Sequence, residues 1–310
     1  MNQDETRAIL ARIITSIVFG IAFVFSKTAL SYVTPIELLS YRFFAAALLM
    51  YLLYCLNIIK ITIRISEIKP LLIISIFQPI LGYYFEMLGL QRISAAEAGI
   101  VLALIPIMVT VTAVPFLKEK PNSKQVFFLI GSFIGVTFIL FIRNGPFSAP
   151  GFLGSVFLII GATGSAIHNI LTRKISAKYS AVDITFTMML SGAVFFGLAN
   201  LAYNLIHHSM DRYFVLLDNP EVFIPVIYLG AFASVIGFLL TNYSLSKMTA
   251  MRVAIFNNLA TVISIMAGVL IMGDHFSKLQ ITGAILIILG VWGVNYYGRK
   301  PLPAVPDSIA

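Results

Sequence analysis

The chain has 310 residues, of which 59% are hydrophobic and 11% are charged, and its formal net charge is +8. An ordinary soluble domain carries about 25% charged residues, so this composition indicates that lipid is the main solvent. A single cysteine, Cys55, excludes an intrachain disulfide and a cysteine metal cluster. The basic residues are spread over short loops instead of forming a tail or an arm, which argues against a nucleic-acid partner.

Ten long apolar runs follow one another along the chain, separated by short polar connections. Each run is longer than the roughly 9–11 residues of a lipid-facing barrel strand and comes close to the about 20 residues of a membrane-spanning helix. The first run, which starts at about Ala8, is too long for the core of a signal peptide. The sequence therefore predicts an all-α membrane protein. Its ten predicted transmembrane helices cover approximately residues 8–30, 35–56, 70–91, 94–116, 124–142, 150–173, 181–205, 221–244, 251–272 and 279–297.

Lysine and arginine are distributed unevenly between the two sets of connections. With a cytoplasmic N-terminus, fifteen of the 21 basic residues fall on the cytoplasmic side, Arg12 among them, and six fall on the opposite side. Cytoplasmic loops of membrane proteins carry such an excess of basic residues. We therefore expect both termini in the cytoplasm, with residues 299–310 as a flexible cytoplasmic tail.

Part of the chain repeats itself at a fixed distance. Residues 94–136 recur 155 positions later, so that Glu119 returns as Asp274 and Gln125 returns as Gln280. The beginnings of the two halves align as well, at an offset of 146 positions. The sequence therefore predicts that the protein is built from two copies of one unit.

Five predicted helices fall in each copy, the first copy covering residues 1–147 and the second covering residues 148–298. Because five is an odd number, the second copy must enter the membrane from the opposite face. The two copies are thus predicted to form an inverted repeat. Many transporters use this arrangement to build alternating access around a site near the middle of the membrane.

The residues of the repeat resemble those of a known transporter family. The shared pattern is a small-residue turn, an apolar helix with a central proline, a glutamate after this helix, and a glycine-rich closing helix. The pattern occurs here as Ser94-Ala95-Ala96, Pro106, Glu119, Gly131 and Gly135, and in the second copy as Thr249-Ala250, Asp274, Gly283 and Gly290. Arg42-Phe43 also matches an Arg-Phe pair that is usual in the second helix. In these positions the chain resembles the EamA family of the drug/metabolite transporter superfamily.

This resemblance implies a ten-helix carrier of the bacterial inner membrane, and many members of the family export amino acids, metabolites or drugs. Two positions depart from the family pattern. Thr261 stands where the second copy usually has proline, which we expect to change the bend of the ninth helix. Asp274 stands where the family usually has glutamate, a replacement that keeps the charge.

The third predicted helix carries the best candidate for a face that lines a transport pathway. Gln78, Gly82 and Glu86 follow one another at intervals of four residues, so a regular helix would place them on one face. Pro79 within this helix frees a backbone carbonyl, as in helices that bend around cavities. Tyr83 flanks the stripe. The alternative is that these small and polar residues hold neighbouring helices together.

Charged residues inside predicted membrane helices are costly and usually face a cavity or a partner. Arg42 lies on the order of 10 Å below the outer end of the second helix, while Lys27, Glu86 and Glu97 lie within about one turn of the outer ends of theirs. We expect these groups to form an outer charged layer in which Arg42 pairs with Glu86. The alternative is a static ion pair that only orients the helices.

The second half supplies a similar set of polar residues. Asn257 and Thr261 share one face of the ninth helix, with Asn258 beside them. His168-Asn169 lies within the sixth helix, and Asn242 lies near the inner end of the eighth. His168 could carry a proton near neutral pH; the alternative is a hydrogen-bonded packing residue.

The sequence contains no paired metal ligands at helical spacing, no HExxH motif and no P-loop, so we expect neither an enzyme nor a cofactor. The expected function is that of a secondary carrier, an exporter of a small organic solute, with a coupling proton carried by Glu86 or His168. The alternatives are a membrane binding or scaffold protein without flux, and an intramembrane enzyme acting on lipid-linked substrates.

Few basic residues enter the predicted helices, which favours a zwitterion or a lipophilic molecule over a multiply charged phosphate as the substrate. The expected partners are therefore this small-molecule substrate and membrane lipid. We expect the carrier to be a monomer or a homodimer.

Overall fold

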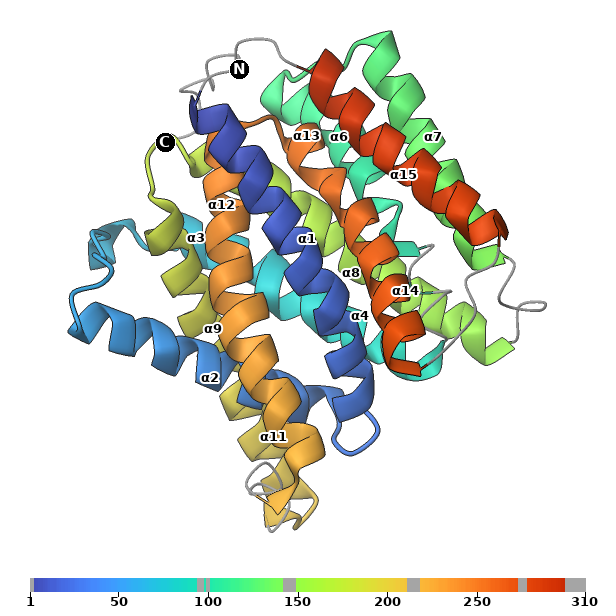
Figure 1. The fold of residues 1–310 in the computed structure, drawn as a ribbon. Helices are drawn as coiled ribbons and strands as arrows, with labels where there is room; N and C mark the ends of the chain where they lie inside the picture. The colour runs from blue at the N-terminus through green and yellow to red at the C-terminus, as the bar shows by residue number, and fades with distance from the viewer. Residues whose placement is uncertain are drawn as a thin grey trace.

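The computed structural model describes residues 3–93, 98, 101–141, 149–210, 218–272 and 278–298, and every regular element in these ranges is a helix (Figure 1). Six helical stretches are long and apolar enough to cross a membrane. They are α1 (Gln3–Ala29), α2 (Pro35–Cys55), the composite helix Lys69–Arg92, α8 (Ala149–Ile175), α9 (Ala181–Ile206) and the composite helix Pro220–Lys247.

The remaining apolar helices are shorter within the described residues. They are α6 (Ile105–Leu117), α7 (Ser123–Phe141), α14 (Phe256–Met272) and α15 (Lys278–Tyr297), while α13 (Ala250–Ala254) and the 3₁₀-helix η1 (Ile65–Glu67) are brief connecting turns. Bulky apolar side chains point outward over the surface, and Phe127 and Ile206 are 72% and 73% exposed. Such a surface is unusual for a soluble monomer and fits one that contacts lipid. The predicted all-α, multi-pass membrane class is confirmed.

Helices α2 and α9 each begin with a hydroxyl side chain that accepts a hydrogen bond from the backbone three residues later. Thr34 accepts a hydrogen bond from the backbone of Glu37, whose side chain accepts one from the backbone of Thr34 in return. Ser180 caps α9 by accepting from the Asp183 backbone, and its own hydroxyl donates to the Asp183 carboxylate. These caps satisfy backbone donors that would otherwise lack partners at a helix start. The two caps stand 146 positions apart, which is the offset seen in the sequence.

Each composite helix contains a π-helical segment in its middle. In the first half, α3 (Lys69–Ser75) passes through η2 (Ile76–Leu81) into α4 (Gly82–Arg92), and in the second half α11 (Pro220–Ile227) passes through η4 (Tyr228–Ile236) into α12 (Gly237–Lys247). Gln78 within η2 leaves the helical conformation, with φ −152° and ψ 121°, just before Pro79. A proline inside a helix removes a backbone donor and disfavours a helical conformation in the residue before it.

The helices pack in pairs that correspond between the two halves. α1 packs against α12 and α14, whereas α8 packs against α4 and α6; α2 packs against α9, and α7 lies beside α15 along one edge (Figure 1). Glycines allow close approach: a Cβ on Gly161 of α8 would lie 2.8 Å from the carbonyl oxygen of Gly82, and one on Gly135 of α7 would lie 2.7 Å from that of Gly283. Small residues play this role in membrane helix interfaces generally.

Because the helices are joined by short connections, their ends gather on two faces of the bundle. We call the face where α1 begins and α15 ends the terminal face; the loop 118–122 and the start of α13 lie on it as well (Figure 1). The residues described next lie on this face or inside the bundle below it.

Candidate transport site

A buried arginine lies inside the bundle below the terminal face. Because α1 starts at Gln3, Arg12 lies roughly 13 Å along the helix from its first residue. Its side chain is 2% exposed. The guanidinium donates from Nη1 to Thr241 Oγ1 at 2.7 Å and from Nη2 to Asn257 Oδ1 at 3.0 Å. Arg12, which the sequence placed among the cytoplasmic basic residues, is thus buried inside the bundle, because the helix starts five residues before the apolar run.

The predicted polar stripe of the ninth helix faces two different neighbours. Asn257 accepts from Arg12 of α1, and Thr261 donates to the Asn257 carbonyl oxygen over 3.5 Å. Asn258 is fully buried and donates to Ser132 Oγ of α7 at 3.0 Å, while its Oδ1 has no partner among the described residues.

Helix α12 contacts polar residues of its neighbouring helices inside the bundle. His168 of α8 is 2% exposed, its ring meets the Phe238 ring edge-on at 5.8 Å, and its Nε2 has no partner in the described part of the chain. Its Nδ1 lies 3.4 Å from Thr172 Oγ1. Asn242 is fully buried and donates to Thr185 Oγ1 of α9 at 3.0 Å. Phe238, Thr241 and Asn242 lie within about one turn of α12, so this turn contacts α8, α1 and α9.

Asn169 turns to its own helix, donating to the Ser165 carbonyl oxygen at 2.8 Å. Ser165 in turn donates from its hydroxyl to Gln78 Oε1 at 2.7 Å. Gln78 thus contacts α8 from within the interrupted helix. The helix is therefore not regular at Gln78, but the Gln78 amide still lies against Gly82, since a Cβ on Gly82 would be 3.1 Å from Gln78 Oε1.

Gly82 lies where α4 and α8 approach each other closely. A Cβ on Gly164 would lie 3.3 Å from the Gly82 Cα, and the carbonyl oxygen of Gly82 lies against Gly161. Gly82 therefore serves helix packing. Glu86 follows on the same helix and is partly buried.

Arg42 is also buried, at 2% exposure, but it lies on another side of the interior. Its Nε donates to Ser234 Oγ of η4 at 2.8 Å, and its guanidinium carbon lies 4.1 Å from the centre of the Tyr83 ring. Arg42 and Glu86, both described, form no ion pair with each other, so the predicted pair is wrong. The hydroxyl of Ser234 and the ring of Tyr83 hold the guanidinium instead. Of the other two members of the predicted charged layer, Lys27 donates to the carbonyl oxygens of Leu90 and Ile93, and Glu97 lies outside the described residues.

Ion pairs between the two halves close the terminal face. Glu119 and Arg173 lie 3.2 Å apart with both side chains 6% exposed, and Glu119 Oε2 also accepts from the Ala250 backbone at 2.9 Å. Burial raises the pKa of the Glu119 carboxyl above its ordinary value, although the Ala250 N–H and Arg173 act in the opposite direction.

Three further ion pairs also join an acid of the first half to a base of the second half. Arg252 contacts Glu5 at 2.7 Å, Lys247 contacts Asp4 at 2.9 Å and Lys178 contacts Glu67 at 3.2 Å. In all four of these pairs, the acid belongs to residues 3–141 and the base belongs to residues 149–298. Sequence reasoning missed this network, because the basic residues were interpreted only as topology signals.

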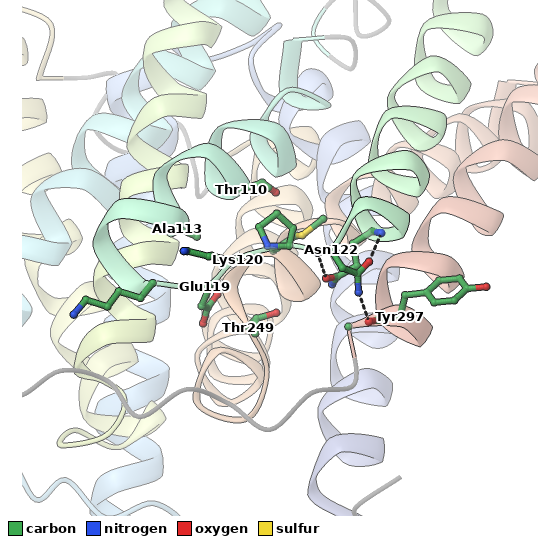
Figure 2. Close-up of a pocket in the computed structure, with 12 residues that line it drawn as sticks. Thr110, Ala113, Glu119, Lys120, Asn122, Thr249 and Tyr297 are labelled. Carbon is green, nitrogen blue, oxygen red and sulfur yellow. Dashed lines mark hydrogen bonds between the residues drawn. The ribbon is translucent and has the colours of Figure 1, made fainter.

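A pocket of about 260 Å³ lies beside Glu119 on the terminal face (Figure 2). On one side, Asn122 donates to the Tyr297 carbonyl oxygen at 2.8 Å, and on the other side lies Glu119 (Figure 2). The pocket is lined by Thr110, Ala113, Lys118, Glu119, Lys120, Pro121, Asn122, Gln125, Thr249, Met251, Tyr297 and Gly298. It therefore lies between the two halves, next to the ion pair that joins them. No group of three metal-ligating residues occurs in the described ranges.

Known proteins are similar to this chain in sequence and in fold. The EamA-like transporter family matches the chain twice, over residues 6–141 and residues 152–296. The "Uncharacterized transporter YcxC" of Bacillus subtilis is 30% identical over 311 residues, which is 99% of each chain. An "Uncharacterized transporter" of Archaeoglobus fulgidus is 24% identical, covering 88% of this chain and 93% of its own.

A solved crystal structure has the same fold, with a TM-score of 0.73 at 14% identity, covering 95% of this chain and 98% of the other. The family matches extend over both halves of the chain, as the repeat in the sequence does. Together with the long apolar helices, these similarities identify a membrane transporter: the chain belongs to the EamA-like transporter family.

Proposed function

We propose that this protein is a secondary carrier of the bacterial inner membrane that exports a small organic solute by alternating access. In this proposal ten helices span the membrane as two inverted repeats, residues 1–147 and 148–298, with both termini in the cytoplasm. The observation that carries the proposal is the set of ion pairs on the terminal face, each joining an acid of the first half to a base of the second. Such pairs can form and break as the halves move against each other.

The polar interior supports the same function. Arg12, His168, Asn242 and Asn258 are buried among apolar helices, and each has a side-chain polar atom without a partner in the described part of the chain. Buried polar groups are normally paired, and exceptions call for an explanation. A transport site offers one, because its polar atoms are paired when the solute is bound.

The test of transport is flux. Purified protein in liposomes is offered amino acids, metabolites and drugs under a solute or proton gradient, and solute exit is followed by mass spectrometry. Protein-dependent, saturable exit of at least one solute is expected. Binding without movement of any solute would favour a scaffold, and product formation without net movement would favour an enzyme.

We also propose that transport is coupled to a proton, which Glu86 or His168 carries. Glu86 takes part in none of the ion pairs of the described residues, and Nε2 of His168 has no partner among them. The variants Glu86→Gln and His168→Ala should therefore weaken the dependence of flux on the pH gradient. Flux that is unchanged in both variants and insensitive to the gradient would remove this part.

A further inference from the structure

Arg12 carries a buried charge that no acidic side chain neutralises in the described chain. The four ion pairs of the described residues do not include it. The two acids on its own helix, Asp4 and Glu5, are bound to Lys247 and Arg252. The two groups that Arg12 hydrogen-bonds, the Thr241 hydroxyl and the Asn257 amide, are both neutral, and so is the Phe256 ring, whose centre lies 6.0 Å from the guanidinium carbon.

The hydrogen bonding of Arg12 is also incomplete. A guanidinium presents five N–H donors in one plane. Its Nε is buried and has no partner in the described part of the chain. Nε and Nη2 together form one edge of the plane, and this is an edge to which a carboxylate binds with both oxygens. Only Asn257 Oδ1 meets that edge.

We propose that Arg12 is the anchor for a single carboxylate on the transported solute, which binds the guanidinium in place of Asn257. This inference rests on the proposed carrier function and names the chemistry of its substrate. A charge buried away from water without a counter-ion is costly, and residues of this kind in membrane helices mark substrate paths. The carboxylate of the solute then supplies the counter-ion that Arg12 lacks in the described chain.

The surroundings of Arg12 limit the ligand to one negative group. The other buried arginines of the described chain are already bound: Arg42 contacts Ser234 and Tyr83, while Arg173 and Arg252 pair with acids. Asn242 and Asn258 lie next to the two contacts of Arg12 along the chain, and each has an unpartnered Oδ1. These oxygens accept hydrogen bonds, so the rest of the solute is expected to carry donors.

A first test requires no ligand. If Arg12 serves substrate binding, replacing its charge relieves a burial cost, so the thermal midpoint of Arg12→Gln in detergent should equal or exceed that of the wild type. Arg252→Gln is the matched control, because Arg252 is equally buried but bonded to Glu5, Asn295 and the Gly298 carbonyl oxygen. That variant should melt at a lower temperature. A fall for Arg12→Gln as large as that for Arg252→Gln would mean a structural arginine and overturn the proposal.

The second test uses pairs of probes, each a small carboxylate and its primary amide, at millimolar concentration in a thermal-shift assay. At least one carboxylate should stabilise the wild type more than its amide does. Its affinity should fall by at least about tenfold in Arg12→Gln and by less in Arg12→Lys, which keeps the charge but not the planar edge. Stabilisation that is equal in Arg12→Gln, or absent for every carboxylate, would overturn the assignment.

The two proposals fail separately. Carboxylate binding that depends on Arg12 without flux in liposomes would reject the carrier and keep the anchor. Flux that Arg12→Gln leaves unchanged would reject the anchor and keep the carrier.

Discussion

Replacing Arg173 by glutamine should open the terminal face. The Glu119–Arg173 pair spans 3.2 Å and both side chains are 6% exposed. At an effective dielectric constant of about 20, the attraction over this distance is about 5 kcal/mol. The neutral side chain costs less to bury, which offsets part of this loss, so we expect a net cost to the closed arrangement on the order of 3 kcal/mol. That corresponds to a shift of about 150-fold in the equilibrium between closed and open arrangements.

The assay measures how fast a buried position reacts with a maleimide. Ala113 lines the pocket next to Glu119 and is 1% exposed. The reporter is Ala113→Cys, with the exposed Cys55 replaced by serine, in protein embedded in nanodiscs. Labelling should be at least about tenfold faster in Arg173→Gln than in the parent.

Lys178→Gln provides the matched control for this experiment. The Lys178–Glu67 pair spans the same 3.2 Å, but its side chains are 64% and 40% exposed. Exposed pairs contribute roughly 0–1 kcal/mol, so labelling should change less than about fivefold. Equal labelling in Arg173→Gln and the parent would refute the reasoning, and so would equal acceleration by Lys178→Gln.

Three further outcomes follow from the same structure. Burial raises the pKa of the Glu119 carboxyl, so keeping this carboxyl ionised and buried costs free energy at a pH above that pKa, and the cost disappears as the pH falls. The faster labelling in Arg173→Gln should therefore approach the parent rate on acidification. A labelling difference that does not depend on pH would contradict this. Gly161→Val should lower the thermal midpoint by forcing apart α4 and α8, whereas Gly197→Ala, with open space around it, should leave the midpoint unchanged. Ser180→Ala should cost about 1 kcal/mol in thermal unfolding, because α9 loses its cap.

Composition and periodicity were sufficient for the fold class, whereas the family came from the resemblance of the repeat residues to a known pattern. Membrane helices must satisfy their backbone groups internally, so long apolar runs leave little choice but helices. The second capping device, at Ser180, also repeats the first in the sequence itself. These features are local or periodic, and a single sequence displays them directly. The number of spans, the repeat boundaries and the orientation in the membrane remain predictions.

The start of the first helix could not be predicted because long-range contacts fix it. Residues 3–7 are mostly polar, which is typical of a loop before a membrane helix. In the structure they are helical, and Asp4 and Glu5 bind Lys247 and Arg252 from the far end of the chain. This extension places Arg12 inside the bundle, which is why its role was missed.

The hydrogen-bond partners of the buried polar groups could not be predicted from the sequence either. The buried position of Arg42 follows from helical rise, but its contact with Ser234 depends on how η4 packs against α2. The position of Gln78 depends on how the backbone rearranges before Pro79, and a proline in the sequence does not specify this.

Movement of the two halves at the terminal face is the central claim, and an electron-spin distance measurement tests it most directly. Labels at Lys120→Cys and Ala177→Cys, in a chain with Cys55 replaced by serine, would lie at exposed positions in the two halves, near Glu119 and Arg173. We predict a short and a long distance in nanodiscs, with the long one enriched by Arg173→Gln. A single distance that Arg173→Gln does not change would contradict an alternating-access carrier closed by these ion pairs.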